Sequence, residues 1–122
     1  MAKLTIGMAH HVDYDGVYFT IQALRLYHPP ELLDDIEIIV VDNSPNDRRT
    51  NKAVQGFVSH FARVGVANTQ YIPLHNPVGT SVSRNMVFEQ ARSEWVMCID
   101  CHIMLLPGAL AKTMAWMDTQ GK

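Results

Sequence analysis

Three patterns that could do chemistry overlap in the five residues from Cys98 to His102, which read CIDCH. The whole stretch matches C-x-x-C-H, the attachment signature of a c-type haem. Its first four residues match C-x-x-C, which is typical of redox and zinc sites. Its last three residues place Asp100 and His102 two positions apart, and a carboxylate with an imidazole suits a divalent ion such as Mn²⁺.

The surrounding sequence argues against both cysteine patterns. The segment EWVMCID is an apolar run that predicts a strand, and residues three apart in a strand point to opposite faces, so Cys98 and Cys101 diverge. A zinc site would need a second cysteine pair, and a redox pair usually opens a helix, whereas the next predicted helix begins at Pro107. We therefore interpret Cys98 as a small buried hydrophobic residue.

The third pattern is consistent with the predicted structure but is not specific. Asp100 and His102 share a face of an extended segment because they are two residues apart. On spacing alone they fit equally a metal-binding pair and a solvated aspartate that caps the loop beside a surface histidine. The choice depends on what the rest of the chain places near them.

The composition is that of an ordinary globular domain. The 122 residues are 48% hydrophobic and 18% charged, with a formal net charge of -2, which predicts one domain with its own core. Because there is no Lys/Arg-rich block, nucleic acid is not an expected partner. The opening MAKLTIGMAHH is too short and too polar for a signal peptide, which also disfavours covalent haem. We expect a cytoplasmic protein with reduced cysteines.

Strand and helix patterns alternate along the chain. Short apolar, β-branched runs predict strands, and apolar positions three or four apart predict helices. This alternation predicts an α/β fold, with a Rossmann-like, mostly parallel sheet flanked by helices. The predicted strands lie at about 4–9, 36–42, 69–74 and 94–100, and the helices at about 13–27, 47–64, 80–92 and from 107 onward.

Most residues capable of chemistry follow the predicted strands. Parallel sheets of this kind bind ligands beyond the carboxyl ends of their strands, where the strand order reverses. In this chain those ends carry AHH, VDNSPND, PLHNPVG and IDCH. The candidate groups therefore meet at one edge of the predicted sheet.

Three stretches also occur in the order and at the spacing of a known family. KLTIGMAHHVDYDGVYFTIQALRLYHP reads as its opening strand, loop and helix, and IEIIVVDNSPND as its second strand, usually VVD(D/N)-S-x-x-D. NPVGTSVSRNMVFEQARSEWVMCIDCHIMLLPGAL reads as its G-x-x-x-x-RN…A…GEW…LDxD…LPPGAL stretch. From about Leu4 to about Lys112, the chain resembles the N-terminal, nucleotide-binding half of a family 2 glycosyltransferase with the GT-A fold. The resemblance implies that residues 1–122 form one nucleotide-diphospho-sugar-binding domain, truncated relative to full-length members.

The resemblance assigns the third pattern to a metal. The family's metal-binding D-x-D falls on Asp100, Cys101 and His102, so that His102 replaces the second acid. Related polypeptide N-acetylgalactosaminyltransferases carry D-x-H, in which both residues bind Mn²⁺. The implied metal ligands are Asp100 and His102, and the implied ion is Mn²⁺ or Mg²⁺.

The resemblance also implies a nucleotide site. The family's base-binding acidic pair falls on Asp42 and Asn43, and its RN pair on Arg84 and Asn85. Its P-T-Y-N loop here reads AHHV, which departs from the family and puts His10 in a nucleotide-contacting place. His11, His28, His60 and His75 are interpreted as surface or packing residues. The implied nucleotide-binding residues are Ala9, His10, Asp42, Asn43, Arg84, Asn85 and Asp100.

Two functions remain after this comparison. The first is a glycosyltransferase, or its donor-binding portion, which takes a UDP-, GDP- or dTDP-sugar and transfers the sugar to an unidentified acceptor. The second is a non-catalytic binding module that keeps the half-fold and self-associates through an uncovered sheet edge. The sequence ends about twenty residues after the D-x-H motif, before the family's acceptor and catalytic-base region, so it names no catalytic residue.

Overall fold

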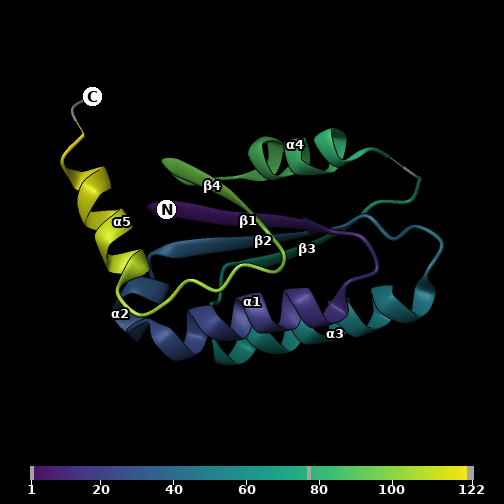
Figure 1. The fold of residues 1–122 in the computed structure, drawn as a ribbon, viewed down its shortest axis with the longest axis horizontal. Coiled ribbons are helices and arrows are strands. Elements are labelled where there is room, and N and C mark those ends of the chain that lie inside the picture. Colours follow the sequence, from purple (N-terminus) through teal and green to yellow (C-terminus); the bar gives the residue numbers. More distant parts are fainter. Residues whose placement is uncertain (1, 77, 121–122) are drawn as a thin grey trace.

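The computed structural model describes residues 2–76 and 78–120, and every predicted strand and helix is present (Figure 1). One further helical turn follows the first long helix, where the HPPE sequence predicts a stop; its proline at the first helical position needs no hydrogen-bond partner. No described helix is long and apolar enough to span a membrane. The elements are β1 (Leu4–His10), α1 (Tyr14–Tyr27), α2 (Pro30–Leu33), β2 (Ile36–Asp42), α3 (Arg48–Val64), β3 (Thr69–Pro73), α4 (Thr80–Gln90), β4 (Trp95–Asp100) and α5 (Ala109–Asp118).

Within the described residues, the four strands form one sheet of order β3-β2-β1-β4, and every pair is parallel. Figure 1 shows α1 and α3 on one face of this sheet and α4 on the other. The predicted α/β class is therefore confirmed. The strand order reverses at β1, since β2 and β3 lie on one side of it and β4 on the other. The register puts His10 opposite Asp42 and Ala9 opposite Asp100, so the strand ends meet at one edge.

The core has a large part beneath α1 and α3 and a smaller part beneath α4. Strand β2 is buried at every position, as its continuous apolar run predicts. Its side chains alternate, so that Ile38 and Val40 join the large cluster while Ile39 and Val41 join Val87 of α4. The two clusters hold the sheet between its helices and fix where each loop leaves the carboxyl edge.

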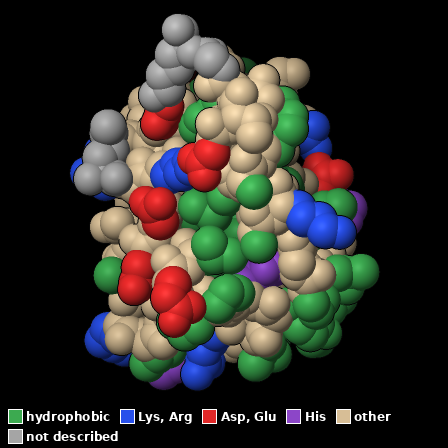
Figure 2. Space-filling view, turned by 90° about the vertical axis from the view of Figure 1, so that its left-hand side faces the viewer, with side chains coloured by type: hydrophobic (Ala, Val, Ile, Leu, Met, Phe, Trp, Pro, Cys, Tyr) green, Lys and Arg blue, Asp and Glu red, His purple; other side chains and the backbone are tan. Residues whose placement is uncertain are grey.

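Helix α5 begins two residues later than the sequence predicts. Gly108, before its first residue, has a φ of 88°, a left-handed conformation that glycine adopts without strain and that delays the helical backbone. The helix docks through Leu110, Met114 and Met117, at the end of the molecule opposite the carboxyl edge. Figure 2 views this end and shows hydrophobic side chains gathered near its centre.

Helix α4 approaches the sheet closely because β1 carries a glycine. A Cβ atom added at Gly7 would lie 2.1 Å from one methyl group of Val87 and 2.9 Å from its Cβ. Neither distance is sterically tolerable, so glycine is required for this packing. Arg84 is also on α4, so the close approach that Gly7 allows helps to position the Arg84 side chain at the carboxyl edge.

A buried polar network joins the ends of β1, β2 and β3. The side chains of His10 and Asp42 are both 0% exposed, and His10 Nε2 lies 3.2 Å from Asp42 Oδ1. The other carboxylate oxygen accepts hydrogen bonds from the Tyr71 hydroxyl (2.5 Å) and the Asn51 amide (2.9 Å). Burial alone would raise the pKa of Asp42, but the His10 contact and the two donors outweigh it and hold that pKa well below its usual range.

Replacing Gly7 tests the close packing of α4. We expect Gly7→Ala to lower the free energy of unfolding by about 1–3 kcal/mol, because the new methyl group displaces Val87. Gly56→Ala is the matched control: Gly56 lies in α3 with no atom within 4 Å of an added Cβ, so this change should stabilise by about 0.5–1 kcal/mol. Urea titration measures both, and equal stabilities would contradict the packing.

Removing the Tyr71 hydroxyl tests the buried network. Because the pKa of Asp42 is lowered in the folded state, its stabilisation is complete above the ordinary carboxyl pKa of about 4 and is lost as the pH falls below that. We expect Tyr71→Phe to cost about 1.5–3 kcal/mol at pH 7 and progressively less below pH 4. Tyr27→Phe, at a half-exposed tyrosine without a described hydrogen bond, should show no such pH dependence.

Candidate functional site

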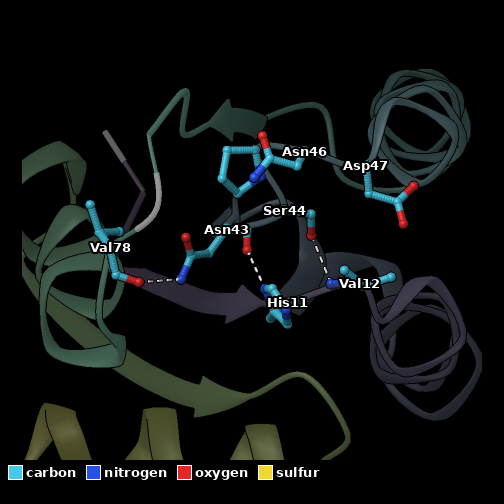
Figure 3. A pocket seen from close by; sticks show the side chains of 8 residues that line it. His11, Val12, Asn43, Ser44, Asn46, Asp47 and Val78 are labelled. Atoms are coloured by element: carbon cyan, nitrogen blue, oxygen red, sulfur yellow. Dashed lines mark hydrogen bonds between the residues drawn. The ribbon is translucent and has the colours of Figure 1, made fainter.

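The loop after β1 is fastened to the loop after β2 by three hydrogen bonds. The Asn43 amide donates to His10 O (2.8 Å), the Val12 amide to Ser44 Oγ (2.7 Å), and His11 Nδ1 lies 2.7 Å from Asn43 O. Figure 3 shows these two loops meeting, with His11 between them. Val12 has a φ of 49°, which turns the chain sharply toward α1. The loops therefore form one fixed wall at the carboxyl edge.

A hollow of about 320 Å³ opens against this wall. Its size lies at the lower end of the range for small-molecule sites, about 300–1,000 Å³. Apolar side chains supply part of its surface, and polar groups from the loops after β1 and β2 supply the rest. The hollow is lined by His11, Val12, Asn43, Ser44, Pro45, Asn46, Asp47 and Val78.

A second hollow of about 80 Å³ shares His11 and Asn43 with the first. Four of the predicted nucleotide-binding residues therefore meet at the point where the strand order reverses. They come from the ends of β1 and β2 and from the second turn of α4. The lining residues are Ala9, His10, His11, Asn43, Thr80, Ser83 and Arg84.

Arg84 links this second hollow to the end of β4. Its guanidinium donates to one carboxylate oxygen of Asp100 at 2.5 Å, and the two side chains are 50% and 44% exposed. The pair thus stands at the surface, where solvent screens it and where a ligand can reach both charges. The start of α4 lies beside it, and no described side chain caps that helix N-terminus.

The structure places His102 on the surface, buries Cys101 and leaves Cys98, which the sequence predicts to be buried, partly exposed. His102 is exposed and has no hydrogen bond or ion pair with the described residues. In the part of the chain that the structure describes, no three His, Cys, Asp or Glu residues are grouped as a metal site. Cys98 packs against the α4 cluster and Cys101 against the α1 cluster, so the two thiols diverge as the strand pattern predicts.

The environment of Cys101 also argues against redox chemistry. Its thiol donates to Asp13 Oδ2 at 3.3 Å, and Asp13 caps α1. Burial, together with this carboxylate, raises the pKa of Cys101 to about 12, and burial likewise raises the pKa of Cys98. Neither group is a thiolate at neutral pH, which a nucleophilic or metal-binding cysteine must be.

Four predicted site residues do not line either hollow: Asp100 and His102, described above, and Asp42 and Asn85. Asp42 is fully buried beneath the loops, and its carboxylate is occupied by the network described above. Asn85 is exposed on α4 and has no described hydrogen bond. His11, Ser44 and Val78 line the larger hollow, although the sequence patterns do not predict them as site residues. Their position directly after strands or before a helix was the available signal, but their orientation depends on hydrogen bonds between loops.

Comparison with solved structures gives folds similar to this one. Residues 1–349 of S. aureus TarS match with a TM-score of 0.75 and 19% identity, over 95% of this chain and 32% of that one. The same protein in complex with UDP-GlcNAc matches with a TM-score of 0.71 and 18% identity, over 95% and 31%. The mannosyltransferase PcManGT from Pyrobaculum calidifontis, in complex with GDP-Man and Mn²⁺, matches with a TM-score of 0.73 and 16% identity, over 94% and 32%. The chain therefore spans about a third of the length of these solved chains, and 19% of a longer TarS chain.

Comparison with curated protein sequences gives no match. The model of one family, described as glycosyl transferase family 2, matches residues 6–122, which is nearly the whole chain. This match agrees with the parallel sheet, the order of its strands and the position of the hollows at their carboxyl ends. The chain belongs to glycosyl transferase family 2.

Proposed function

We propose that this chain is the donor-binding portion of a glycosyltransferase and binds a nucleoside diphosphate sugar at the carboxyl edge of its sheet. The observation that carries the proposal is the pair of adjoining hollows at the point where the strand order reverses. Arg84 lines the smaller of them and pairs with Asp100. The fold relatives support it, since TarS has been solved with UDP-GlcNAc and PcManGT with GDP-Man. Transfer to an acceptor is part of the proposal, and the residues that would catalyse it are not assigned.

The nucleoside would occupy the larger hollow. Val12, Pro45 and Val78 offer apolar surface to a flat ring, while the His11 and Asn46 side chains offer polar edges. A small apolar hollow with a few fixed polar groups is typical of sites that bind and orient a nucleoside. The loops that form it are already joined by hydrogen bonds, so little conformational freedom would be lost on binding.

The diphosphate would lie toward the smaller hollow. Arg84 supplies a permanent positive charge there, and its planar guanidinium can donate two hydrogen bonds to phosphate oxygens. The N-terminus of α4 adds unpaired backbone N–H groups and the positive end of the helix dipole, both of which favour an anion. These groups would also stabilise the diphosphate as a leaving group.

A divalent cation would be held by Asp100 and His102. Asp100 is half-exposed and His102 exposed, so neither is sealed away from a ligand, and they supply one oxygen and one nitrogen donor. This mixed pair favours Mn²⁺ over Mg²⁺, which prefers oxygen ligands. Phosphate oxygens and water would complete the coordination, since the described residues offer no third ligand. The cation would neutralise charge on the diphosphate as the glycosidic bond breaks.

Calorimetry with nucleoside diphosphates tests this proposal. We expect UDP, GDP or dTDP to bind more tightly in the presence of Mn²⁺ than in its absence. Asp100→Asn should weaken the Mn²⁺-dependent binding by about tenfold or more, because one of the two protein ligands loses its charge. Asp34→Asn is the control, since Asp34 is exposed at the other end of β2. Absence of binding to all three nucleotides with Mn²⁺ would overturn the proposal.

A second candidate function is a non-catalytic module that self-associates. It is favoured by an apolar groove of about 280 Å³ between β4 and α5, lined by Leu4, Trp95, Val96, Met97, Thr113, Trp116 and Met117. Among the described residues β4 pairs only with β1, so it is an edge strand beside this groove. Unpaired edges and exposed apolar patches both promote association with another copy.

Sedimentation velocity distinguishes this second function. If the groove mediates association, the chain should sediment as a dimer, and Trp116→Lys should shift it to a monomer by placing a charge in the groove. Phe19→Lys is the matched control, because Phe19 is similarly exposed but lies on α1. A monomer at all concentrations would rule out self-association.

A further inference from the structure

We propose that His11 selects the nucleoside by accepting a hydrogen bond at Nε2 from an N–H or O–H group of the ligand. The inference rests on the proposed function, because it concerns the occupant of the larger hollow. It gives His11 a role in ligand binding, whereas the sequence patterns alone indicate a surface or packing residue. Three observations carry it: the carbonyl partner of Nδ1, the fixed position of the ring and the absence of a described partner at Nε2.

The tautomer follows from the partner of Nδ1. This nitrogen lies 2.7 Å from the main-chain oxygen of Asn43, and a carbonyl oxygen can only accept a hydrogen bond. The proton of the neutral imidazole must therefore be on Nδ1. Nε2 then carries a lone pair and is an acceptor.

The ring is held in place by the loops on either side of it. The residue before it, His10, accepts a hydrogen bond from the Asn43 amide, and the residue after it, Val12, donates one to Ser44. The His11 side chain adds the third bond of this set (Figure 3). The ring cannot turn without breaking its bond to Asn43, so the acceptor at Nε2 has a fixed direction.

Nε2 is free to meet a ligand. His11 is exposed, and no described residue pairs with this nitrogen. His11 and Asn43 are the side chains that line both hollows. In the Asn43 amide group, Nδ2 donates to Val78 O at 3.0 Å, and Oδ1 has no described partner but is buried, so a ligand cannot reach it. His11 is therefore the side chain at this junction with an unused and accessible polar atom.

A fixed acceptor discriminates between nucleosides. The ring N–H of uracil, thymine or guanine can donate to it, as can a ribose hydroxyl. The ring N3 of cytosine carries a lone pair instead, and two lone pairs facing each other leave both acceptors without a hydrogen bond. Sites that provide one half of a hydrogen bond reject analogues that lack the other half.

Variants at position 11 test the roles of the two ring nitrogens one at a time. In His11→Asn the amide N–H can still donate to Asn43 O, but the acceptor at the Nε2 position is lost. We expect the melting temperature to be unchanged and UDP, with Mn²⁺, to bind about 2- to 10-fold more weakly. His11→Gln places an acceptor near the Nε2 position and should recover part of the affinity. His60→Asn, at an exposed histidine of α3, is the matched control.

Comparison of three ligands identifies which group of the ligand donates the hydrogen bond to His11. If the base donates, the unsubstituted chain should prefer UDP to CDP, and His11→Asn should lose that preference. If the ribose donates, the preference that His11→Asn loses should be that for UDP over 2′-deoxy-UDP. Either result supports the inference, and calorimetry of the three ligands with both proteins measures them.

Two negative results have different meanings. If the unsubstituted chain binds UDP, and His11→Asn binds each of the three ligands as tightly as the unsubstituted chain does, the role of His11 is overturned while the proposed function stands. If the unsubstituted chain binds no nucleoside diphosphate with Mn²⁺, the proposed function fails, and the inference fails with it.

Discussion

A single buried carboxylate, Asp42, holds the carboxyl edge of the sheet together. It is the last residue of β2, and its two oxygens engage side chains from β1, β3 and α3, namely His10, Tyr71 and Asn51. Burying a charge is costly unless it is paired and hydrogen-bonded; here Oδ2 accepts two hydrogen bonds, and Oδ1 lies 3.2 Å from His10 Nε2. The ends of three neighbouring strands are consequently fixed relative to one another. The walls of the hollows above these strand ends are therefore held in place as well.

The rigidity extends from the buried layer to the surface in two steps. His10 Nδ1 accepts a hydrogen bond from the Asp13 amide (3.2 Å), which places the residue that caps α1. Between them, His11 is fixed by its bond to Asn43. The family resemblance gives Asp42 direct contact with a base, whereas in the structure it supports His10 beneath the loops, and the residues next to both, His11 and Asn43, line the hollows.

The fold was largely predictable from the sequence, and the site only in part. Alternating apolar patterns give the strands, and the residues that follow them, such as Asn43, reach one edge in any parallel sheet. The burial of Asp42 could not be predicted, because a strand that is apolar on both faces has no period-two pattern to show which way its last side chain points. The role of His11 depends on a hydrogen bond to a residue 32 positions away, which no local pattern encodes.

The Arg84–Asp100 pair sets the electrostatics of the proposed donor site. Each group neutralises the other at the surface, where the interaction contributes at most about 1 kcal/mol to stability. A weak pair is easily exchanged, since a diphosphate would compete for the guanidinium and a cation for the carboxylate. Because the two charges have opposite sign, a donor that brings both a diphosphate and a cation satisfies both groups at once, whereas either alone leaves one charge without a partner. In the proposed site, the binding of the diphosphate and that of the cation would therefore be coupled.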